Sequence, residues 1–371
     1  MNNAQKFEIL LVTPPGLEQP LRAEAIELGF KKPHQIKGGV TIEGSWQDIW
    51  RANLEMRGAS RILVRLGDFH VNHLAELDKK ARKFPWSDFF HEDIPLRVDV
   101  SCKKSKIYHQ KAARERIERA ITEELNAPVS KDAELTIKVR IFENLCTISV
   151  DSSGEGLHIR NHKEALNRAP MRETMAALLL RKSSYKGKEP VVDPMCGSGT
   201  FVLEAAEIAK GLKAGRNRRF AFEQLKSFDA TEWETLKSSI FEKETRPQFY
   251  GFDRDAGAIK IANANAKRAG VADLTHFSQQ TISELICPED EPETGLVIVN
   301  PPYGIRIGEE KQLLPLYQTL GRQIQSNFKG WRFALVTNSH KLAKATGLTF
   351  DPTVTTFSHG GINVRLYTAS I

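Results

Sequence analysis

Blocks of alternating apolar and polar residues mark the first part of the chain, residues 1–66. The alternation predicts strands at 7–12, 39–42 and 61–66. Apolar residues at helical spacing predict a helix at 17–28, and Ser45 is placed to cap the N-terminus of another. One face of that second helix would carry the apolar side chains of Trp46, Ile49, Trp50 and Leu54. Residues 1–66 are therefore expected to form a small α/β unit.

The next part, residues 67–155, predicts a helix, a strand, a basic helix and a closing pair of strands. Alternation predicts the strands at 96–102, 135–142 and 145–150, with the last two joined at Glu143-Asn144. Between them, residues 110–125 place Ala113, Ile117, Ala120, Ile121 and Leu125 on one helix face. We expect a second domain of the α+β class here.

Residues 165–371 alternate apolar strands with amphipathic helices, which is typical of an α/β domain. The predicted strands are 191–193, 248–252, 274–277, 296–299, 332–337, 353–357 and 362–368. The predicted helices between them are 201–212, 256–269 and 313–328, followed by a short one after Asn338. One segment, 220–247, interrupts the pattern with scattered aromatic residues and is expected to form a covering helix.

Charge suggests a polyanionic partner. The net charge is +7 with a pI near 9.1, and basic residues gather in two runs, at 101–120 and 210–219. Lys103, Lys104, Lys106, Lys111 and Arg114 belong to the first run. A solvated helix face would explain one run alone, but the two together favour contacts with RNA phosphates.

The sequence also indicates the cellular compartment of the protein and the kinds of binding site that are not expected. The N-terminal apolar stretch at 7–12 is interrupted by Glu8 and ends before Pro14-Pro15, so neither a signal peptide nor a membrane span is expected. The four cysteines are far apart and the histidines lack the spacing of metal ligands, so no disulfide framework and no metal site are expected. A cytoplasmic location fits these features.

The most informative stretch joins the strand at 191–193 to a helix and reads Asp193-Pro194-Met195-Cys196-Gly197-Ser198-Gly199-Thr200. Gly197 and Gly199 can adopt backbone angles that other residues avoid and can let a ligand approach the backbone. The stretch lacks the lysine of a triphosphate-binding P-loop and the third glycine of the dinucleotide fingerprint. It resembles the first motif of class I methyltransferases that use S-adenosylmethionine (AdoMet).

A second motif narrows that resemblance. The strand at 296–299 ends in Asn300-Pro301-Pro302-Tyr303, which is similar to the signature of enzymes that methylate exocyclic amino groups of nucleobases. A stretch from Ala169 that contains Pro170, Glu173 and Thr174 resembles the helix that precedes the AdoMet site in the same family. A connecting helix with a surface ion pair is the alternative for this third stretch.

These resemblances imply a set of cofactor ligands. They are Pro170, Glu173, Thr174, Asp193, Pro194, Gly197, Gly199, Thr200, Asp253, Thr281 and Asn300. Asp253 ends the strand at 248–252, where a carboxylate can accept hydrogen bonds from both ribose hydroxyls, whereas Asp255 is expected to cap the following helix. The family commonly has an aspartate for the adenine amino group after the next strand. Residues 278–282 contain no acid, which leaves Gln280 or Thr281 as the acceptor.

The second motif also indicates the reaction. An exocyclic amino nitrogen is a poor nucleophile because its lone pair is delocalised into the ring. The Asn300 side-chain oxygen and the Pro301 carbonyl can accept its two protons and bias it toward a tetrahedral geometry, while Tyr303 offers a plane on which an unstacked base can rest. Asn300, Pro301 and Tyr303 are therefore the predicted catalytic residues. Methylation of a pyrimidine carbon would need a nucleophilic cysteine, and none stands beside this motif.

The first 155 residues resemble a ferredoxin-like domain followed by a THUMP domain, an RNA-binding module. The whole chain is thus similar to THUMP-containing guanine-N2 RNA methyltransferases. The resemblance implies a Rossmann-like class I methyltransferase domain, preceded by an α+β ferredoxin-like and THUMP region. It also implies AdoMet as cofactor and, as substrate, the 2-amino group of a guanosine in 23S rRNA. Alternatives are a tRNA guanine methyltransferase of the same architecture, a DNA amino methyltransferase and a non-catalytic RNA-binding assembly factor.

Overall fold

The computed structural model describes residues 5–163, 171–239, 244–245, 247–288, 294–303 and 309–371. Contacts divide the chain into two compact units, each of which contains three segments. The N-terminal unit comprises Met1–Thr13, Arg22–Leu157 and Arg218–Ser239. The catalytic unit, named for the motifs it carries, comprises Pro14–Leu21, His158–Asn217 and Ile240–Ile371.

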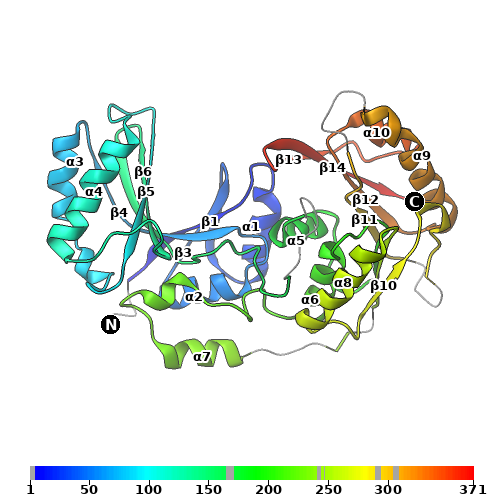
Figure 1. Ribbon diagram of the computed structural model, residues 1–371, viewed down its shortest axis with the longest axis horizontal. Coiled ribbons are helices and arrows are strands. Elements are labelled where there is room, and N and C mark those ends of the chain that lie inside the picture. Colours follow the sequence, from blue (N-terminus) through cyan, green and yellow to red (C-terminus); the bar gives the residue numbers. More distant parts are fainter. Residues whose placement is uncertain (1–4, 164–170, 240–243, 246, 289–293, 304–308) are drawn as a thin grey trace. The chain divides into compact units, whose positions relative to one another are not determined.

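The N-terminal unit is built on one seven-stranded sheet with the order β2-β3-β1-β4-β7-β6-β5 (Figure 1). Its strands are β1 (Phe7–Val12), β2 (Lys31–Ile36), β3 (Gly39–Gly44), β4 (Arg61–His70), β5 (Leu96–Lys103), β6 (Leu135–Phe142) and β7 (Leu145–Asp151). β4 extends past the predicted end at Leu66, pairing first with β1 and then with β7. The two regions predicted to be separate domains, 1–66 and 67–155, therefore share one sheet.

The helices of this unit follow the predicted pattern. They are α2 (Trp46–Glu55), α3 (Leu74–Arg82) and α4 (Gln110–Leu125), together with the C-terminal part of α1 (Glu18–Glu27). Ser45 caps α2 as predicted, and a reciprocal hydrogen bond from its backbone N–H to Asp48 completes a capping box. α4 buries the five apolar residues predicted to face the core, and packs against both α3 and β5 (Figure 1).

A segment far along the chain completes the N-terminal unit. The predicted covering helix is α7 (Ala230–Ser238), preceded by the short 3-10 turn η2 (Ala221–Gln224). The Phe222 ring lies 6.0 Å from Trp50 of α2 and 5.0 Å from Trp233. The Arg218 guanidinium donates hydrogen bonds to the carbonyl oxygens of Ser153, Glu155 and Gly156. Arg218–Ser239 thus packs on the N-terminal unit, although it lies within the range 165–371 predicted as one domain.

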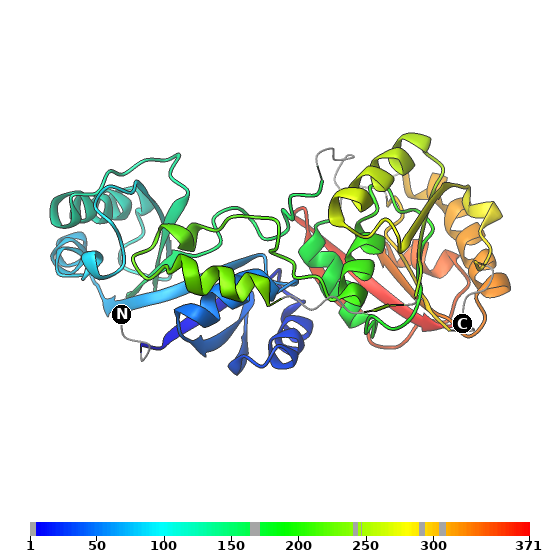
Figure 2. The same ribbon diagram turned by 90° about the horizontal axis from the view of Figure 1, so that it is seen from below.

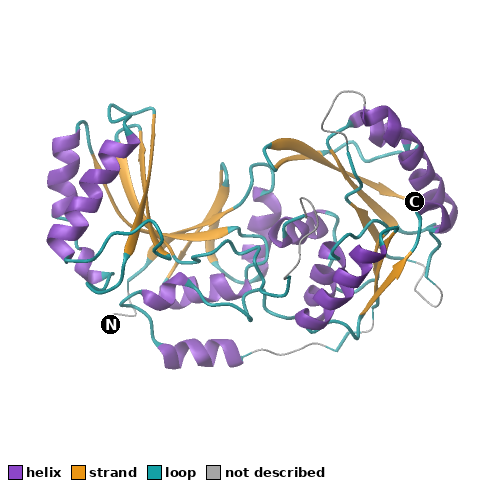
Figure 3. Ribbon diagram, in the orientation of Figure 1, coloured by secondary structure: helices purple, strands orange, loops and turns teal. Residues whose placement is uncertain are grey.

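The catalytic unit contains a second seven-stranded sheet, with the order β10-β9-β8-β11-β12-β14-β13. Its strands are β8 (Val191–Asp193), β9 (Phe249–Asp253), β10 (Thr275–Gln279), β11 (Leu296–Val299), β12 (Arg332–Thr337), β13 (Thr355–His359) and β14 (Ile362–Ser370). β8 to β12 run parallel, whereas β14 is antiparallel to both neighbours. The carboxyl ends of five strands therefore meet at one edge (Figures 2 and 3).

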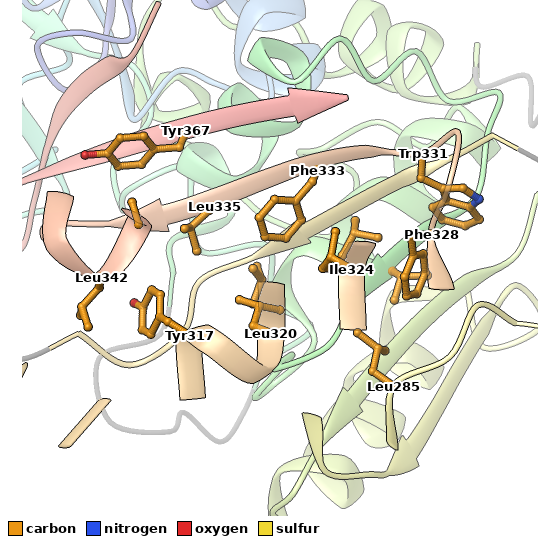
Figure 4. Close-up of a cluster of buried hydrophobic side chains, with 14 residues drawn as sticks. Leu285, Tyr317, Leu320, Ile324, Phe328, Trp331, Phe333, Leu335, Leu342 and Tyr367 are labelled. Carbon is orange, nitrogen blue, oxygen red and sulfur yellow. The ribbon is translucent and has the colours of Figure 1, made fainter. Parts of the chain in front are cut away.

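Helices cover both faces of this sheet (Figures 1 and 3). α5 (Glu173–Lys182), α6 (Thr200–Lys210) and α8 (Ala256–Ala269) lie on one side, and α9 (Glu309–Asn327) and α10 (His340–Ala345) on the other. Figure 4 shows the core between α9 and the sheet, in which Tyr317, Leu320 and Ile324 pack against residues of β11 and β12. α9 begins before the predicted residue 313 and contains Pro315.

Candidate active site

The Gly-rich turn between β8 and α6 adopts the backbone that its glycines permit. Gly197 has φ +52° and Gly199 has φ +86°, in the left-handed region that favours glycine. A Cβ on Gly199 would also come within 3.0 Å of the Phe277 ring of β10. Gly199 is therefore required by packing under the turn, an additional reason that the sequence did not reveal.

Asp253, at the end of β9, fixes this turn. One carboxylate oxygen accepts the N–H of Gly197 at 2.9 Å, and the other accepts the N–H of Asp255 at 3.0 Å. Asp255 in turn caps α8 by accepting the Gly257 N–H at 2.8 Å, as predicted. Each carboxylate oxygen of Asp253 has a second lone pair with which it can accept another hydrogen bond.

Asp193 lies beneath the same turn and is almost completely buried. Burial, opposed by a hydrogen bond from the Met195 N–H and reinforced by the charge of Asp253, raises the pKa of the Asp193 carboxyl to about 8. The surroundings of the Asp193 carboxyl therefore favour its neutral, protonated form.

A cavity of about 440 Å³ opens where the strands β8 to β11 end. Among the described residues, its lining consists of Pro194, Met195, Asp253, Arg254, Gln280, Thr281, Ile282, Asn300, Pro302, Gln312, Leu313 and Leu316. Four of the predicted cofactor ligands are thus brought together: Pro194, Asp253, Thr281 and Asn300. The apolar wall from α9, Leu313 and Leu316, was not predicted as part of a site.

Asn300 supplies the cavity's most distinctive polar atom. Its Oδ1 is buried and has no hydrogen-bond partner among the described residues, which is costly unless a ligand provides a donor. The adjoining loop is held by Tyr317 of α9, whose hydroxyl donates to the carbonyl oxygen of Pro302 at 3.2 Å. The loop is therefore anchored beside a buried acceptor for which the described residues offer no donor.

The other two predicted catalytic residues lie beside Asn300 and outside the cavity's lining. Pro301 is buried, and Tyr303 is partly buried against the core of Figure 4. That burial raises the pKa of the Tyr303 hydroxyl. Tyr303 therefore packs one part of its ring against protein rather than projecting freely from the loop.

Thr281 and Gln280 both donate hydrogen bonds to Glu284 of the 3-10 turn η3 (Ile282–Glu284). The Glu284 carboxylate accepts the Thr281 N–H at 3.0 Å and its hydroxyl at 2.8 Å, which lowers the pKa of Glu284. The Gln280 amide donates to the Glu284 carbonyl at 2.6 Å. Glu284 is thus an acid close to residues 278–282, which contain none. Its carboxylate stabilises the turn, and it is not among the residues that line the cavity.

The remaining predicted cofactor ligands form a separate buried network. Lys163 Nζ lies 2.8 Å from the Glu173 carboxylate and donates to Thr200 Oγ1 at 2.7 Å. Thr174 is buried beside them in α5. This network joins the start of α5 to the start of α6 without lining the cavity. Pro170 lies outside the described residues.

The predicted RNA-binding residues lie in the N-terminal unit, at the end of β5 and in α4. Lys103, Lys104, Lys106 and Lys111 are exposed, whereas Arg114 is partly buried and 3.6 Å from Glu118. The second basic run behaves differently, and the expectation that it contacts phosphates is wrong for Arg216 and Arg218. Arg216 pairs with the buried Glu207 at 2.7 Å, and Arg218 is bound to carbonyl oxygens, as described above.

Two other kinds of site are absent from the described part of the chain. No helix there is long and apolar enough to cross a membrane. Within the same residues, no cluster of three or more His, Cys, Asp or Glu side chains is arranged to hold a metal ion. The cavity at the ends of β8 to β11 is therefore the centre of the candidate site.

Comparison with known families agrees with this geometry. A family model described as "RMKL-like, methyltransferase domain" matches residues 160–364, which is more than half of the chain. The chain belongs to the RMKL-like methyltransferase family. Two further models match ahead of it, an RlmL ferredoxin-like domain at 8–63 and a THUMP domain at 71–151. The predicted fold class is confirmed: ferredoxin-like and THUMP domains precede a Rossmann-like methyltransferase domain.

Several curated relatives of this RMKL-like chain are named ribosomal RNA large subunit methyltransferase K/L. The protein from Psychromonas ingrahamii is 34% identical over 91% of this chain and 46% of its own length. The one from Aliivibrio fischeri is 35% identical over 90% of this chain and 49% of its own length. The chain spans about half the length of the curated relatives it matches.

Solved structures resemble the chain over almost its whole length. One is described as a predicted N6-adenine-specific DNA methylase from Listeria monocytogenes, with 28% identity, a TM-score of 0.88 and coverage of 98% of this chain and 96% of that one. Another is described as a methyltransferase in complex with SAH, with 25% identity, a TM-score of 0.89 and coverage of 100% and 99%. The arrangement of domains is therefore shared by proteins of the same size.

Proposed function

We propose that this chain transfers a methyl group from AdoMet to the exocyclic 2-amino group of a guanosine in 23S rRNA. The observation that carries the proposal is at Asn300, which lines the cavity and whose buried Oδ1 has no hydrogen-bond partner among the described residues. Relatives named as rRNA methyltransferases support an rRNA substrate, and the THUMP match supports RNA binding.

The residues of the cavity fit AdoMet. A volume of about 440 Å³ lies within the usual range for a small-molecule site. Asp253 can accept hydrogen bonds from ribose hydroxyls through the lone pairs that the Gly197 and Asp255 N–H groups leave open, and Ile282, Leu313 and Leu316 offer apolar contact to a base. Bound AdoMet supplies a methyl group on a positively charged sulfur. A structural neighbour in complex with SAH supports the same ligand here.

The other predicted cofactor ligands shape or support the Gly-rich turn between β8 and α6, which borders this cavity. Gly197 and Gly199 give the turn its shape and Pro194 lines the cavity directly. Asp193 supports the turn from below through the Met195 N–H. Glu173 and Thr200 are linked through Lys163 at the start of α6, Thr174 is buried beside Glu173 in α5, and Pro170 belongs to the same motif.

Asn300 and Pro301 orient the substrate's amino group. The Asn300 Oδ1 accepts one amino proton and the Pro301 carbonyl accepts the other, so the lone pair is withdrawn from the ring and turned toward the cavity. The hydrogen bond from Tyr317 to the Pro302 carbonyl anchors this loop, which supports a preorganised position for both acceptors. Tyr303 provides the apolar plane beside the base, and the cavity holds the reacting groups in register.

Mass spectrometry of nucleosides from a deletion strain tests the function. We expect N2-methylguanosine to be lost from one position in 23S rRNA and to be unchanged in tRNA. Expression of the parental chain should restore it, and expression of Asn300→Ala should not. Loss from tRNA with intact 23S rRNA would contradict the substrate, and no loss from either RNA would contradict the reaction.

A further inference from the structure

The turn between β5 and α4 exposes an aromatic ring. Tyr108 is 71% exposed, more than the other large hydrophobic side chains that stand exposed in the described part of the chain. Its neighbour Ile107 is buried, only 4% exposed, so the turn is fastened to the core one residue before the ring. The His109 ring lies 4.1 Å from the Tyr108 ring, with 41° between the two planes.

Hydrogen bonds hold this turn in one shape. The Lys106 N–H donates to Asn144 Oδ1 at 2.9 Å, and the Asn144 N–H donates to Ser105 Oγ at 3.1 Å. The Ser105 hydroxyl in turn donates to the Lys103 carbonyl at 2.9 Å. The turn is thus tied to itself and to the turn between β6 and β7. Tyr108 is presented by a fixed backbone, which reduces the entropy lost when a ligand packs on its ring.

Positive charge surrounds the ring. The exposed cations near it in the chain are Lys103, Lys104, Lys106 and Lys111. Arg140 of the adjacent strand β6 is also exposed, with its guanidinium stacked 4.3 Å from the Phe142 ring. The nearby acid is Glu143, 3.9 Å from Lys104 Nζ. Residues 101–114 contain five basic residues and no acid, and the acids Glu115 and Glu118 follow in α4.

We propose that Tyr108 stacks on an unpaired base of single-stranded RNA while the surrounding lysines contact the phosphates beside that base. The proposal rests on the proposed function, because it assumes an RNA substrate. Bases inside a duplex are stacked on one another and cannot place a face on a protruding ring, whereas every unpaired base offers one. The lysines alone would bind paired and unpaired RNA alike. The ring therefore gives this surface a preference for single strands and loops.

Fluorescence anisotropy on the full chain tests the preference. The probes are a short oligouridylate and a blunt RNA duplex with the same number of phosphates. Tyr108→Ala should weaken binding of the oligouridylate by about 5-fold to 150-fold, the usual range for loss of one base–aromatic stack. It should leave duplex binding and the salt dependence of both probes unchanged. Tyr108→Phe keeps the ring and should bind as the parental chain does.

Ile36→Ala, at another exposed apolar side chain in the N-terminal unit, is the matched control and should change neither probe's affinity. An equal loss for both probes would overturn the stacking role, and so would unchanged oligouridylate binding by Tyr108→Ala. Equal weakening by Tyr108→Phe would show that the hydroxyl, and not the ring, is what matters. If the parental chain binds neither probe, both the stacking role and the RNA-binding part of the proposed function fail. If the parental chain binds RNA and only the Tyr108 results differ from expectation, the stacking role alone fails.

Discussion

The two sheets contain seven strands each, yet they distribute polar residues differently. In the catalytic unit five neighbouring strands run parallel, so the residues that follow β8, β9, β10 and β11 converge on one cavity. In the N-terminal unit only β5 and β6 pair in parallel, and neighbouring strands mostly end at opposite edges. Strand direction therefore decides whether polar groups are collected in a pocket or spread over a surface. Substitutions in each unit test that contrast.

The largest expected effect is a loss of stability that tests whether the segment Arg218–Ser239 belongs to the N-terminal unit. Phe222 is completely buried in the N-terminal unit, although the segments before and after Arg218–Ser239 belong to the catalytic unit. Phe222→Ala should destabilise the N-terminal unit by about 3–5 kcal/mol, as expected for a fully buried phenylalanine. Hydrogen exchange should show faster exchange in β4 and α2. Phe328→Ala, at an equally buried position in the other core, should instead affect β11 and β12. Faster exchange in the catalytic unit for Phe222→Ala would contradict the assignment.

The next effect concerns Asn300, whose Oδ1 has no hydrogen-bond partner in the described part of the chain. Asn300→Ala should reduce methyl transfer by about 10²–10³-fold, the range for removal of one preorganised polar group that acts on a reacting atom. SAH affinity should change little. Single-turnover assays and calorimetry measure the two quantities separately. Asn263→Ala, at an exposed asparagine of α8, serves as the control and should behave like the parental chain. Transfer at the parental rate in Asn300→Ala would remove Asn300 from the mechanism.

A smaller effect is expected at Asp253. Asp253→Ala should weaken SAH binding by about 1.5–3 kcal/mol, because charge-assisted hydrogen bonds disappear and the Gly197 N–H no longer has its partner. Asp255→Ala removes a helix cap two residues away and should cost about 0.5–2 kcal/mol of stability without that loss of affinity. Calorimetry and thermal unfolding distinguish them. Equal affinities for the two variants would show that Asp253 is not a ligand.

The smallest effect per residue is expected on RNA affinity, at the exposed lysines of the first basic run. Neutralising Lys103, Lys104 and Lys106 together should flatten the dependence of log K on log salt by about 0.7–0.9 for each phosphate that the protein no longer binds. RNA binding measured over a series of salt concentrations gives the slope. Three exposed lysines elsewhere in the same unit, Lys31, Lys37 and Lys131, provide the matched control. An unchanged slope would mean that the first run is only a solvated face.

Sequence reasoning succeeded where the signal is local. Gly197 and Gly199 adopt the positive φ angles that the sequence of their turn allows, and Asp255 and Ser45 act as the predicted caps. The strands around them were predicted because buried parallel strands are short apolar runs. The family match confirms the domain order that these signals predicted.

Contacts between distant segments could not be predicted in this way. Leu313, Leu316 and Tyr317 carry a normal helical pattern, and only the docking of α9 on the sheet decides which of them face the cavity and which bind the Pro302 loop. Arg216 and Arg218 look like part of a basic run, but they donate hydrogen bonds to the carbonyl oxygens of Ala269 and Gly156, which lie far away in the sequence. Phe222 and Trp233 predicted a covering helix without indicating what it covers.

The route of the chain through its two units has a consequence for cutting and recombining the gene. The polypeptide crosses from one unit to the other after Thr13, Leu21, Leu157, Asn217 and Ser239. A fragment that stops at Leu157 would lack Phe222 and Phe228 and would leave Trp50 without these two rings that lie against it. Exchange of the N-terminal unit between homologues therefore requires transplanting several discontinuous segments together, including Arg218–Ser239. A chimera joined at a single site would combine the core of one N-terminal unit with the Arg218–Ser239 segment of another protein.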